Sequence, residues 1–155
     1  MFGTRMTRIT RLLRERGYEL DIRKPRFDDP LPVTMQDHAG AVIFGGPMSV
    51  NGSEDWIRRE IEWLGVPLRE NVPLLGICLG AQMLAKHLGG CVSPHADGVH
   101  EIGYWPIRPT EAGRKLFDWP DYVYHWHEEG FELCCGMELL ATGDTFQNQA
   151  VRCGP

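Results

Sequence analysis

Hydrophobic and polar positions in the first half of the chain alternate between short apolar runs and helical stripes. Ala41–Phe44 and Leu74–Ile77 are uninterrupted apolar runs, typical of strands buried on both faces of a parallel sheet. Between them, apolar residues recur at helical spacing over 57–68, and Ser53 is placed to cap that helix. A second helix is predicted over Leu79–Leu88. Strand, helix, strand and helix in this order predict an α/β fold with a doubly wound sheet.

The amino-terminal segment has the pattern of one amphipathic helix followed by a strand. Its arginines recur at helical spacing opposite an apolar stripe: Arg5, Arg8, Arg11 and Arg14 against Met6, Ile9 and Leu13. Organellar targeting peptides share this pattern with helices that have one solvated face. We favour the solvated helix, because Gly17 ends it and the alternation over 18–22 predicts a strand immediately afterwards.

The second half contains shorter runs separated by turn-rich segments. Strands are predicted at 100–107, 122–127, 139–141 and 149–153, with a short helix near 111–117. These strands are either later members of the same sheet or a small antiparallel extension. Without a repeat or a linker, residues 1–155 are expected to form one domain.

Composition and charge narrow the class of protein. Apolar residues make up 43% and charged residues 24% of the 155, and no apolar run approaches the length of a membrane span. Residues 1–27 carry eight Arg or Lys and three acids, whereas the remainder is acidic and the whole chain has a net charge of -5. An acidic body argues against nucleic acid as the main partner. The five cysteines form no CxxC pair, and with no secretory signal we expect the reducing cytoplasm.

The sharpest local motif is Gly76-Ile77-Cys78-Leu79-Gly80, which lies between a predicted strand and a predicted helix. Glycine two residues before and two residues after the cysteine permits the tight turn of a nucleophile elbow. A thiolate there lies at a helix N-terminus, where the helix dipole favours the ionised form. A buried structural cysteine is the alternative.

The sequence resembles the class I glutamine amidotransferases, most closely their stand-alone, GMP-synthase-like members. The segments that carry the resemblance are Ala41–Ser49, Pro73–Gln82, Glu101–Tyr104, Trp126-His127, Leu139–Ala141 and Gln149–Arg152. The resemblance covers nearly the whole chain and implies a three-layer, mostly parallel, flavodoxin-like sheet.

The resemblance also implies a reaction and its residues. Cys78 corresponds to the nucleophile that forms a γ-glutamyl thioester with glutamine and releases ammonia to a synthetase partner; no cofactor is implied. The second oxyanion donor would come from Gly46, beside the N–H of Leu79. The residues implied to contact glutamine are Gln82 and the backbone around Trp126, His127 and Glu128.

The family's catalytic base and its orienting acid come from a His-Pro-Glu segment shortly after the stretch that matches Gln149–Arg152. This sequence contains no His-Pro-Glu, so we expect it to lack the catalytic His-x-Glu, and it begins almost directly with the first helix. We therefore expect an incomplete domain that lacks its first and last strands and two members of the triad, and that is a poor catalyst as it stands.

Two further possibilities concern metals and other functions. His125 and His127 would share one face of a strand, but spacing suggests no third ligand, so no metal site is expected. A γ-glutamyl hydrolase of the same superfamily, or a non-catalytic binding module with a glutamine-like pocket, are the alternative functions; a cysteine peptidase agrees less well with Gln82 and the Gly-Gly-Pro loop.

Overall fold

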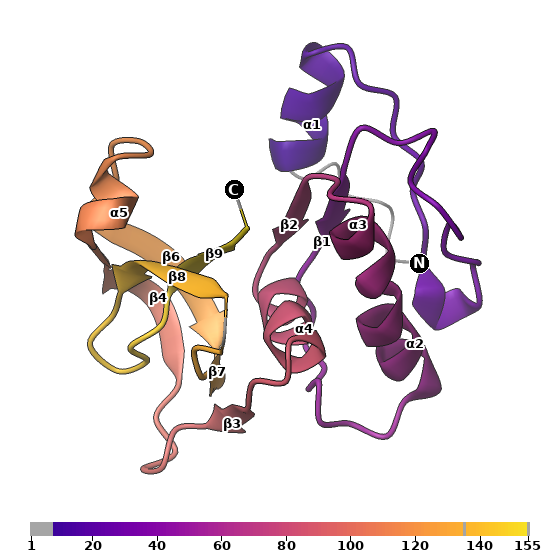
Figure 1. The fold of residues 1–155 in the computed structure, drawn as a ribbon. Helices are drawn as coiled ribbons and strands as arrows, with labels where there is room; N and C mark the ends of the chain where they lie inside the picture. The colour runs from indigo at the N-terminus through magenta and orange to yellow at the C-terminus, as the bar shows by residue number, and fades with distance from the viewer. Residues whose placement is uncertain (1–7, 135, 155) are drawn as a thin grey trace. The chain divides into compact units, whose positions relative to one another are not determined.

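The computed structural model describes residues 8–134 and 136–154, and the chain divides into two compact units, 1–31 and 32–155. None of the helices among the described residues is both long and apolar enough to cross a membrane. Figure 1 shows the elements of the chain with their labels.

The first unit contains the helix α1 (Arg8–Glu15) and a single 3₁₀ turn, η1 (Pro25–Phe27). The predicted helix is confirmed, and Gly17, with φ +84°, ends it: Gly17 N–H donates to Arg14 and Tyr18 N–H donates to Leu13. Met6 and Arg5 lie outside the described residues. The strand predicted over 18–22 is wrong, since these residues form no strand ladder. Alternation alone is insufficient, because a strand requires a partner for its backbone groups.

The second unit begins with a compact α/β region. Its elements are β1 (Ala41–Ile43), α2 (Asp55–Trp63), α3 (Gly65–Arg69), β2 (Leu74–Gly76) and α4 (Leu79–His87). Strands β1 and β2 pair in parallel, in the register Ala41 to Leu74 and Ile43 to Gly76. The strand and helix positions predicted here are confirmed to within a residue or two.

Burial of the two parallel strands differs from the prediction. Leu75 is 49% exposed and Phe44, just after β1, is 38% exposed, so the runs are not buried on both faces. Among the described residues the parallel sheet has only these two strands. The α/β class holds, and the doubly wound parallel sheet stays a prediction.

The helix predicted over 57–68 is interrupted at Leu64, and its cap differs as well. Pro67 has no N–H to donate to Trp63, so α2 ends there, while Pro67 is tolerated in the first turn of α3. The N-cap position of α2 is Glu54, which makes no side-chain capping bond, so the capping role predicted for Ser53 is wrong.

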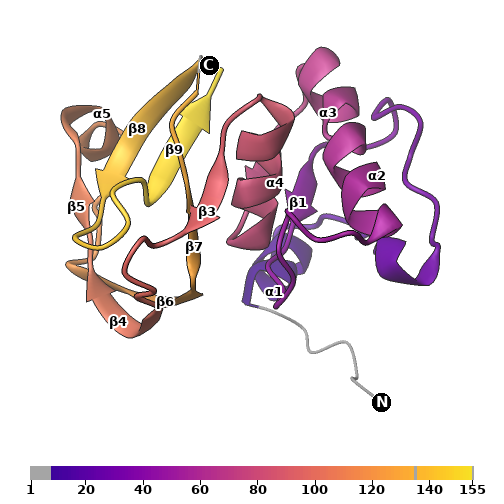
Figure 2. The ribbon, with the colours of Figure 1, turned by 90° about the horizontal axis from the view of Figure 1, so that it is seen from below.

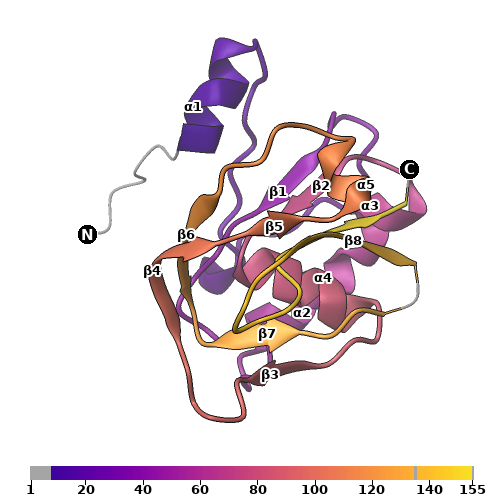
Figure 3. The ribbon, with the colours of Figure 1, turned by 90° about the vertical axis from the view of Figure 1, so that its left-hand side faces the viewer.

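The later strands form antiparallel sheets, which resolves the choice left open by the sequence. The elements are β3 (Val92–Pro94), β4 (Glu101–Pro106), β5 (Arg108–Pro109), α5 (Glu111–Arg114), β6 (Tyr122–His127), β7 (Glu129–Phe131), β8 (Met137–Thr142) and β9 (Ala150–Cys153). The pairs are β3 with β7, β4 with β6, and β5 with β8 and β9. Figure 3 shows β4 and β6 side by side.

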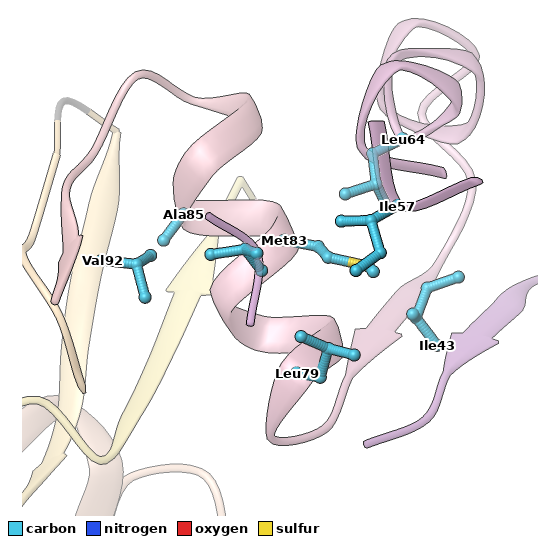
Figure 4. Packing of buried hydrophobic residues seen from close by; sticks show 8 residues of the cluster. Ile43, Ile57, Leu64, Leu79, Met83, Ala85 and Val92 are labelled. Atoms are coloured by element: carbon cyan, nitrogen blue, oxygen red, sulfur yellow. The ribbon is translucent and has the colours of Figure 1, made fainter. Parts of the chain in front are cut away.

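Helix α4 is the central element of the second unit. It contacts α2 and the strands β1, β2, β3 and β7, and Figure 2 shows it between the parallel pair and the strands β3 and β7. The core around it consists of Ile43, Val50, Ile57, Leu64, Leu79, Met83, Ala85 and Val92. Figure 4 shows Met83 between Ile57 and Ala85. This packing fixes α4, and with it the residue at its start.

Candidate functional site

Cys78 occupies a strained turn between β2 and α4. Its φ of +54° and ψ of −111° place a non-glycine residue in a backbone region that L-amino acids rarely adopt. The turn is held because Ile77 N–H donates to Ile43 at 2.9 Å and Gly80 N–H donates to Ile77 at 3.0 Å. The thiol is exposed, and its sulfur lies 4.0 Å from the carbonyl oxygen of Trp126. This is the geometry that the elbow motif predicts.

Two glycines make the turn possible for steric reasons. A Cβ atom at Gly76 would lie 2.7 Å from the carbonyl group of Gly80, and a Cβ atom at Gly80 would overlap the carbonyl oxygen of Ile43. Both contacts are with backbone atoms, which cannot rotate away. The glycines on either side of Cys78 are therefore required by close packing between β1, β2 and α4.

The loop after β1 passes directly over the thiol. A Cβ atom at Gly45 would lie 3.3 Å from the sulfur of Cys78, so this loop can approach only as glycine. Gly46 follows, half-buried against Met48 and the side chain of Leu79. Leu79 is the first residue of α4, a position whose N–H has no partner within the helix. The elbow and the loop after β1 thus both lie beside the exposed thiol.

A cleft of about 230 Å³ opens in front of the thiol. It is lined by Gly46, Pro47, Met48, Ser49, Cys78, Gln82, His100, Ile102, Trp126, His127, Glu128 and Glu129. The cleft therefore brings together six of the seven residues predicted for the site. The seventh, Leu79, is buried and is not among the lining residues.

Gln82 connects helix α4 to the opposite wall of the cleft. Its side chain is 7% exposed, and its Nε2 donates to the carbonyl oxygen of Glu129 at 2.9 Å. Ser49 makes a second connection, because its hydroxyl donates to the Glu129 carboxylate at 2.9 Å. Gln82 thus has a structural role in addition to facing the cleft.

Two acidic residues, Glu128 and Glu129, line the cleft. Glu128 is exposed and lies 3.6 Å from Nδ1 of His100, while the Glu129 carboxylate is held by Ser49. Carboxylates in the lining of a small cleft suit a ligand with an ammonium group.

The strongest polar cluster in the wall was missed by sequence reasoning. Glu101 is fully buried, and its Oε2 lies 2.6 Å from Nδ1 of His125 and 2.8 Å from Nε2 of His127. Gln149 Nε2 donates to the same oxygen at 3.0 Å. The register of β4 and β6, which places Glu101 opposite His127, brings the three residues together. Spacing within one strand could not reveal this third group.

His127 cannot act as a base toward the thiol in this arrangement. Its Nδ1 lies 3.0 Å from the Glu129 carbonyl oxygen and its Nε2 faces Glu101, so both ring nitrogens have partners in the wall. The residues His127-Glu128-Glu129 do form a His-x-Glu, but they are not a base and its orienting acid for Cys78.

Comparisons with known proteins agree on one family. The family model described as "Glutamine amidotransferase class-I" matches residues 3–150. A glutamine amidotransferase-like protein of Salmonella typhimurium, YfeJ, is 30% identical over 152 residues, which is 90% of this chain and 62% of that protein. A GMP synthase [glutamine-hydrolyzing] of Neisseria meningitidis is 34% identical over 157 residues, covering 98% of this chain and 27% of that protein.

Solved structures are similar as well. A glutamine amidotransferase of Thermotoga maritima superposes with a TM-score of 0.82 at 27% identity, covering 94% of this chain and 65% of that one. A glutamine amido transferase of Methylobacillus flagellatus gives a TM-score of 0.84 at 28% identity, covering 94% of this chain and 59% of that one. The chain therefore spans about three fifths of these relatives and about a quarter of the GMP synthase.

Proposed function

This chain belongs to the class-I glutamine amidotransferase family, and we propose that its cleft binds glutamine and cleaves the side-chain amide through a thioester on Cys78. The single observation that carries the proposal is the strained, exposed thiol at the start of α4, facing a cleft that the loop at Gly46 also lines.

The proposed reaction has two steps. The sulfur of Cys78 forms a bond to the amide carbon of glutamine, the carbon–nitrogen bond breaks, and the nitrogen leaves as ammonia after taking up a proton. Water then cleaves the thioester, which releases glutamate and restores the thiol. Negative charge on the carbonyl oxygen in each step would be met by the N–H groups of Gly46 and Leu79.

The amino-acid end of glutamine, opposite the amide, would lie beside the acidic residues that line the cleft. Its ammonium group suits Glu128, and the backbone of Trp126 and His127 would orient the amino-acid end. Gln82 would contact the substrate from the floor of the cleft, where it also holds the Glu129 carbonyl. A cleft of about 230 Å³ is of the size of a small ligand.

Among the described residues, none is placed to remove the proton from the Cys78 thiol. The polar partner of the Cys78 sulfur is the Trp126 carbonyl, and both nitrogens of His127 have other partners. We therefore propose slow turnover by this chain, with covalent capture of Cys78 as the more sensitive measurement, since a missing base typically costs several orders of magnitude in rate.

The experiment is alkylation of the chain with a diazoketone analogue of glutamine, followed by peptide mass spectrometry. We expect one adduct, on Cys78, formed faster than with iodoacetamide at equal concentration and suppressed by free glutamine but not by asparagine. The matched control is Cys91→Ala, which removes another exposed thiol and should leave the adduct unchanged. Cys78→Ala should abolish it.

The outcomes separate the candidate functions. Selective capture together with ammonia release supports a glutaminase, and selective capture or glutamine binding without ammonia release supports a non-catalytic binding module. Reaction of Cys78 at the same rate with both reagents, unaffected by glutamine, would refute a glutamine site. Turnover of γ-glutamyl conjugates but not of glutamine would identify a γ-glutamyl hydrolase.

The wider setting is proposed on the same basis. Ammonia would pass to an acceptor bound by a synthetase partner, because relatives are named GMP synthase [glutamine-hydrolyzing]. The four described cysteines are free, which suits the cytoplasm. We also propose that β1 and β2 belong to a doubly wound parallel sheet, an arrangement supported by the TM-scores of 0.82 and 0.84 to amidotransferase structures.

A further inference from the structure

The cluster of Glu101, His125 and His127 has no role in the chemistry proposed for Cys78. One ligand-type atom from each of the three residues lies within 4.8 Å of the others. Two of the residues lie on β6 and the third lies opposite on β4, so the positions are fixed by the ladder between two strands. The three side chains are 1% exposed for Glu101, 10% for His125 and 17% for His127.

Hydrogen bonds around the Glu101 carboxylate are distributed unevenly. Oε2 has three nitrogen atoms within 3.0 Å, contributed by His125, His127 and Gln149. Oε1 is buried and has no hydrogen-bond partner within the part of the chain that the structure describes. A buried carboxylate oxygen left without a partner is costly, and a bound cation is one of the standard explanations for such an oxygen.

The second nitrogen of His127 indicates what lies between the ring and the carboxylate. Its Nδ1 lies 3.0 Å from the Glu129 carbonyl, an oxygen that can only accept, so Nδ1 carries a hydrogen. A neutral ring then has a lone pair on Nε2, directed at a carboxylate oxygen 2.8 Å away. At 2.8 Å a hydrogen lies between these two atoms in the metal-free chain, and a metal ion in its place, with bonds of about 2.0–2.1 Å, would hold them about 3.3 Å apart.

The surroundings are those of a metal-ligating histidine. Such a ligand usually donates its other N–H to a carbonyl or carboxylate, which fixes the tautomer and the ring orientation. Phe146, which is 7% exposed, packs on the His127 ring with centroids 4.8 Å apart and shields the cluster from solvent. Gln149 holds both Glu101 and the Phe146 carbonyl.

We propose that Glu101, His125 and His127 form a binding site for a divalent transition-metal ion of the zinc type. Two imidazoles and one carboxylate form a ligand set that zinc uses when a further position is left to water. The cobalt ion occupies such sites with the same ligands. Sequence spacing predicted no metal for want of a third ligand, and Glu101 supplies that ligand. Bound metal would fix the β4–β6 wall beside the cleft without taking part in thioester chemistry.

The test is titration of the purified chain, stripped with a chelator, with Co²⁺ monitored by visible absorption and with Zn²⁺ monitored by calorimetry. We expect one ion per chain, absorption bands of low-symmetry, tetrahedral or five-coordinate Co²⁺, displacement of Co²⁺ by Zn²⁺, and a rise in melting temperature with either ion. Glu101→Gln and His125→Ala should each weaken binding at least about 10-fold.

Two control variants address other ligands. His100→Ala removes an exposed histidine that lines the same cleft, and Cys78→Ser removes the sulfur atom that would otherwise be a competing zinc ligand. Both should bind Co²⁺ as the unsubstituted chain does. A sulfur-to-cobalt charge-transfer band, or loss of binding in Cys78→Ser, would overturn the proposal.

The proposal stays testable if a cluster variant fails to fold. X-ray absorption of the Zn²⁺-loaded, unsubstituted chain should then show nitrogen and oxygen ligands, with two histidines and no sulfur. Absence of stoichiometric binding to the folded, unsubstituted chain would mean that a proton joins His127 to Glu101, and would overturn the inference. Because binding is read without glutamine, its failure leaves the proposed glutaminase chemistry unaffected.

Discussion

The two walls of the cleft are built in different ways. The wall that carries Cys78 is largely local: strand β2, the elbow and helix α4 are consecutive in sequence, and the glycines two positions away on each side permit the turn, although Gly80 also packs against Ile43 of β1. The opposite wall, made by β4, β6 and β7, joins residues 26 positions apart, as in the contact of His127 with Glu101. Local packing of small residues determines the first wall, and a buried polar network determines the second. Substitutions in the two walls should therefore destabilise the protein for different physical reasons.

Substitution of Glu101 by alanine should have the largest effect, and should act on the nonlocal wall. It leaves His125, His127 and Gln149 without their shared acceptor in a buried site. Leaving a buried polar group without its partner typically costs about 1–3 kcal/mol of unfolding free energy, and three side chains lose theirs here. Urea denaturation measures the loss.

Glu128→Ala is the control for Glu101→Ala. It removes an exposed carboxylate, 3.6 Å from His100, on the same wall. Its effect on the unfolding free energy should stay within about 0.5 kcal/mol. Equal effects of the two variants would show that the wall does not depend on the buried network.

Gly80→Ala should be the next largest change, and should act on the local wall. The new Cβ atom would overlap the carbonyl oxygen of Ile43, so β1 and α4 must separate. Overpacking of this kind costs about 3 kcal/mol when backbone atoms must move. The measurements are urea denaturation and the rate of Cys78 alkylation by iodoacetamide, which should change together.

Gly89→Ala is the control for Gly80→Ala, and separates steric overlap from backbone conformation. Gly89 has φ +87°, and a Cβ atom added there would meet nothing within 4 Å, so only the positive φ opposes alanine. The cost should be about 1 kcal/mol, with no change in thiol reactivity. A loss as large as that of Gly80→Ala would contradict a steric origin for the elbow glycines.

Gln82→Leu should weaken the link between the two walls without disrupting either one. The substitution removes the donor to the Glu129 carbonyl at 2.9 Å and keeps a similar volume. We expect a loss of about 1–2 kcal/mol and faster amide hydrogen exchange across β7. Lys86→Leu, four residues along the helix, removes only an exposed bond to Asn51 and should leave exchange in β7 unchanged.

The smallest effect is expected away from the cleft, from the exposed pair of Arg108, on β5, and Asp144, in the loop after β8. The hydrogen bond and charge of Arg108 hold the pKa of Asp144 below its ordinary value. A lowered folded-state pKa stabilises the protein above the ordinary pKa of aspartate, and that contribution disappears as pH falls through the lowered value.

Melting temperatures of the unsubstituted chain and of Asp144→Asn test this pair as a function of pH. The unsubstituted chain should melt slightly higher near neutral pH, and the two curves should converge in acid. Strong salt should reduce the difference, because the pair is exposed to solvent. A difference that persists unchanged at low pH would contradict an ionic origin.

Sequence alone predicts the local wall and much of the fold. Cys78, Gly76 and Gly80 follow from one motif, and β6 is confirmed at the predicted residues 122–127. The buried role of Glu101 could not be predicted, because it depends on which residue of β4 faces which residue of β6. The residues that follow it, Ile102-Gly103-Tyr104, do not indicate that Glu101 is fully buried. Similarly, the strand predicted over 18–22 lacks a partner ladder, which alternation cannot guarantee.

The backbone conformation at Cys78 disfavours any side chain at this position. At φ +54° and ψ −111° any residue with a Cβ atom is strained, whereas glycine is not. Cys78→Gly should therefore raise the unfolding free energy, by an amount of the order of 1 kcal/mol once the greater chain entropy of unfolded glycine is subtracted. Backbone strain of this kind at a residue with a side chain is typical of functional sites, and here it lies directly beside the cleft.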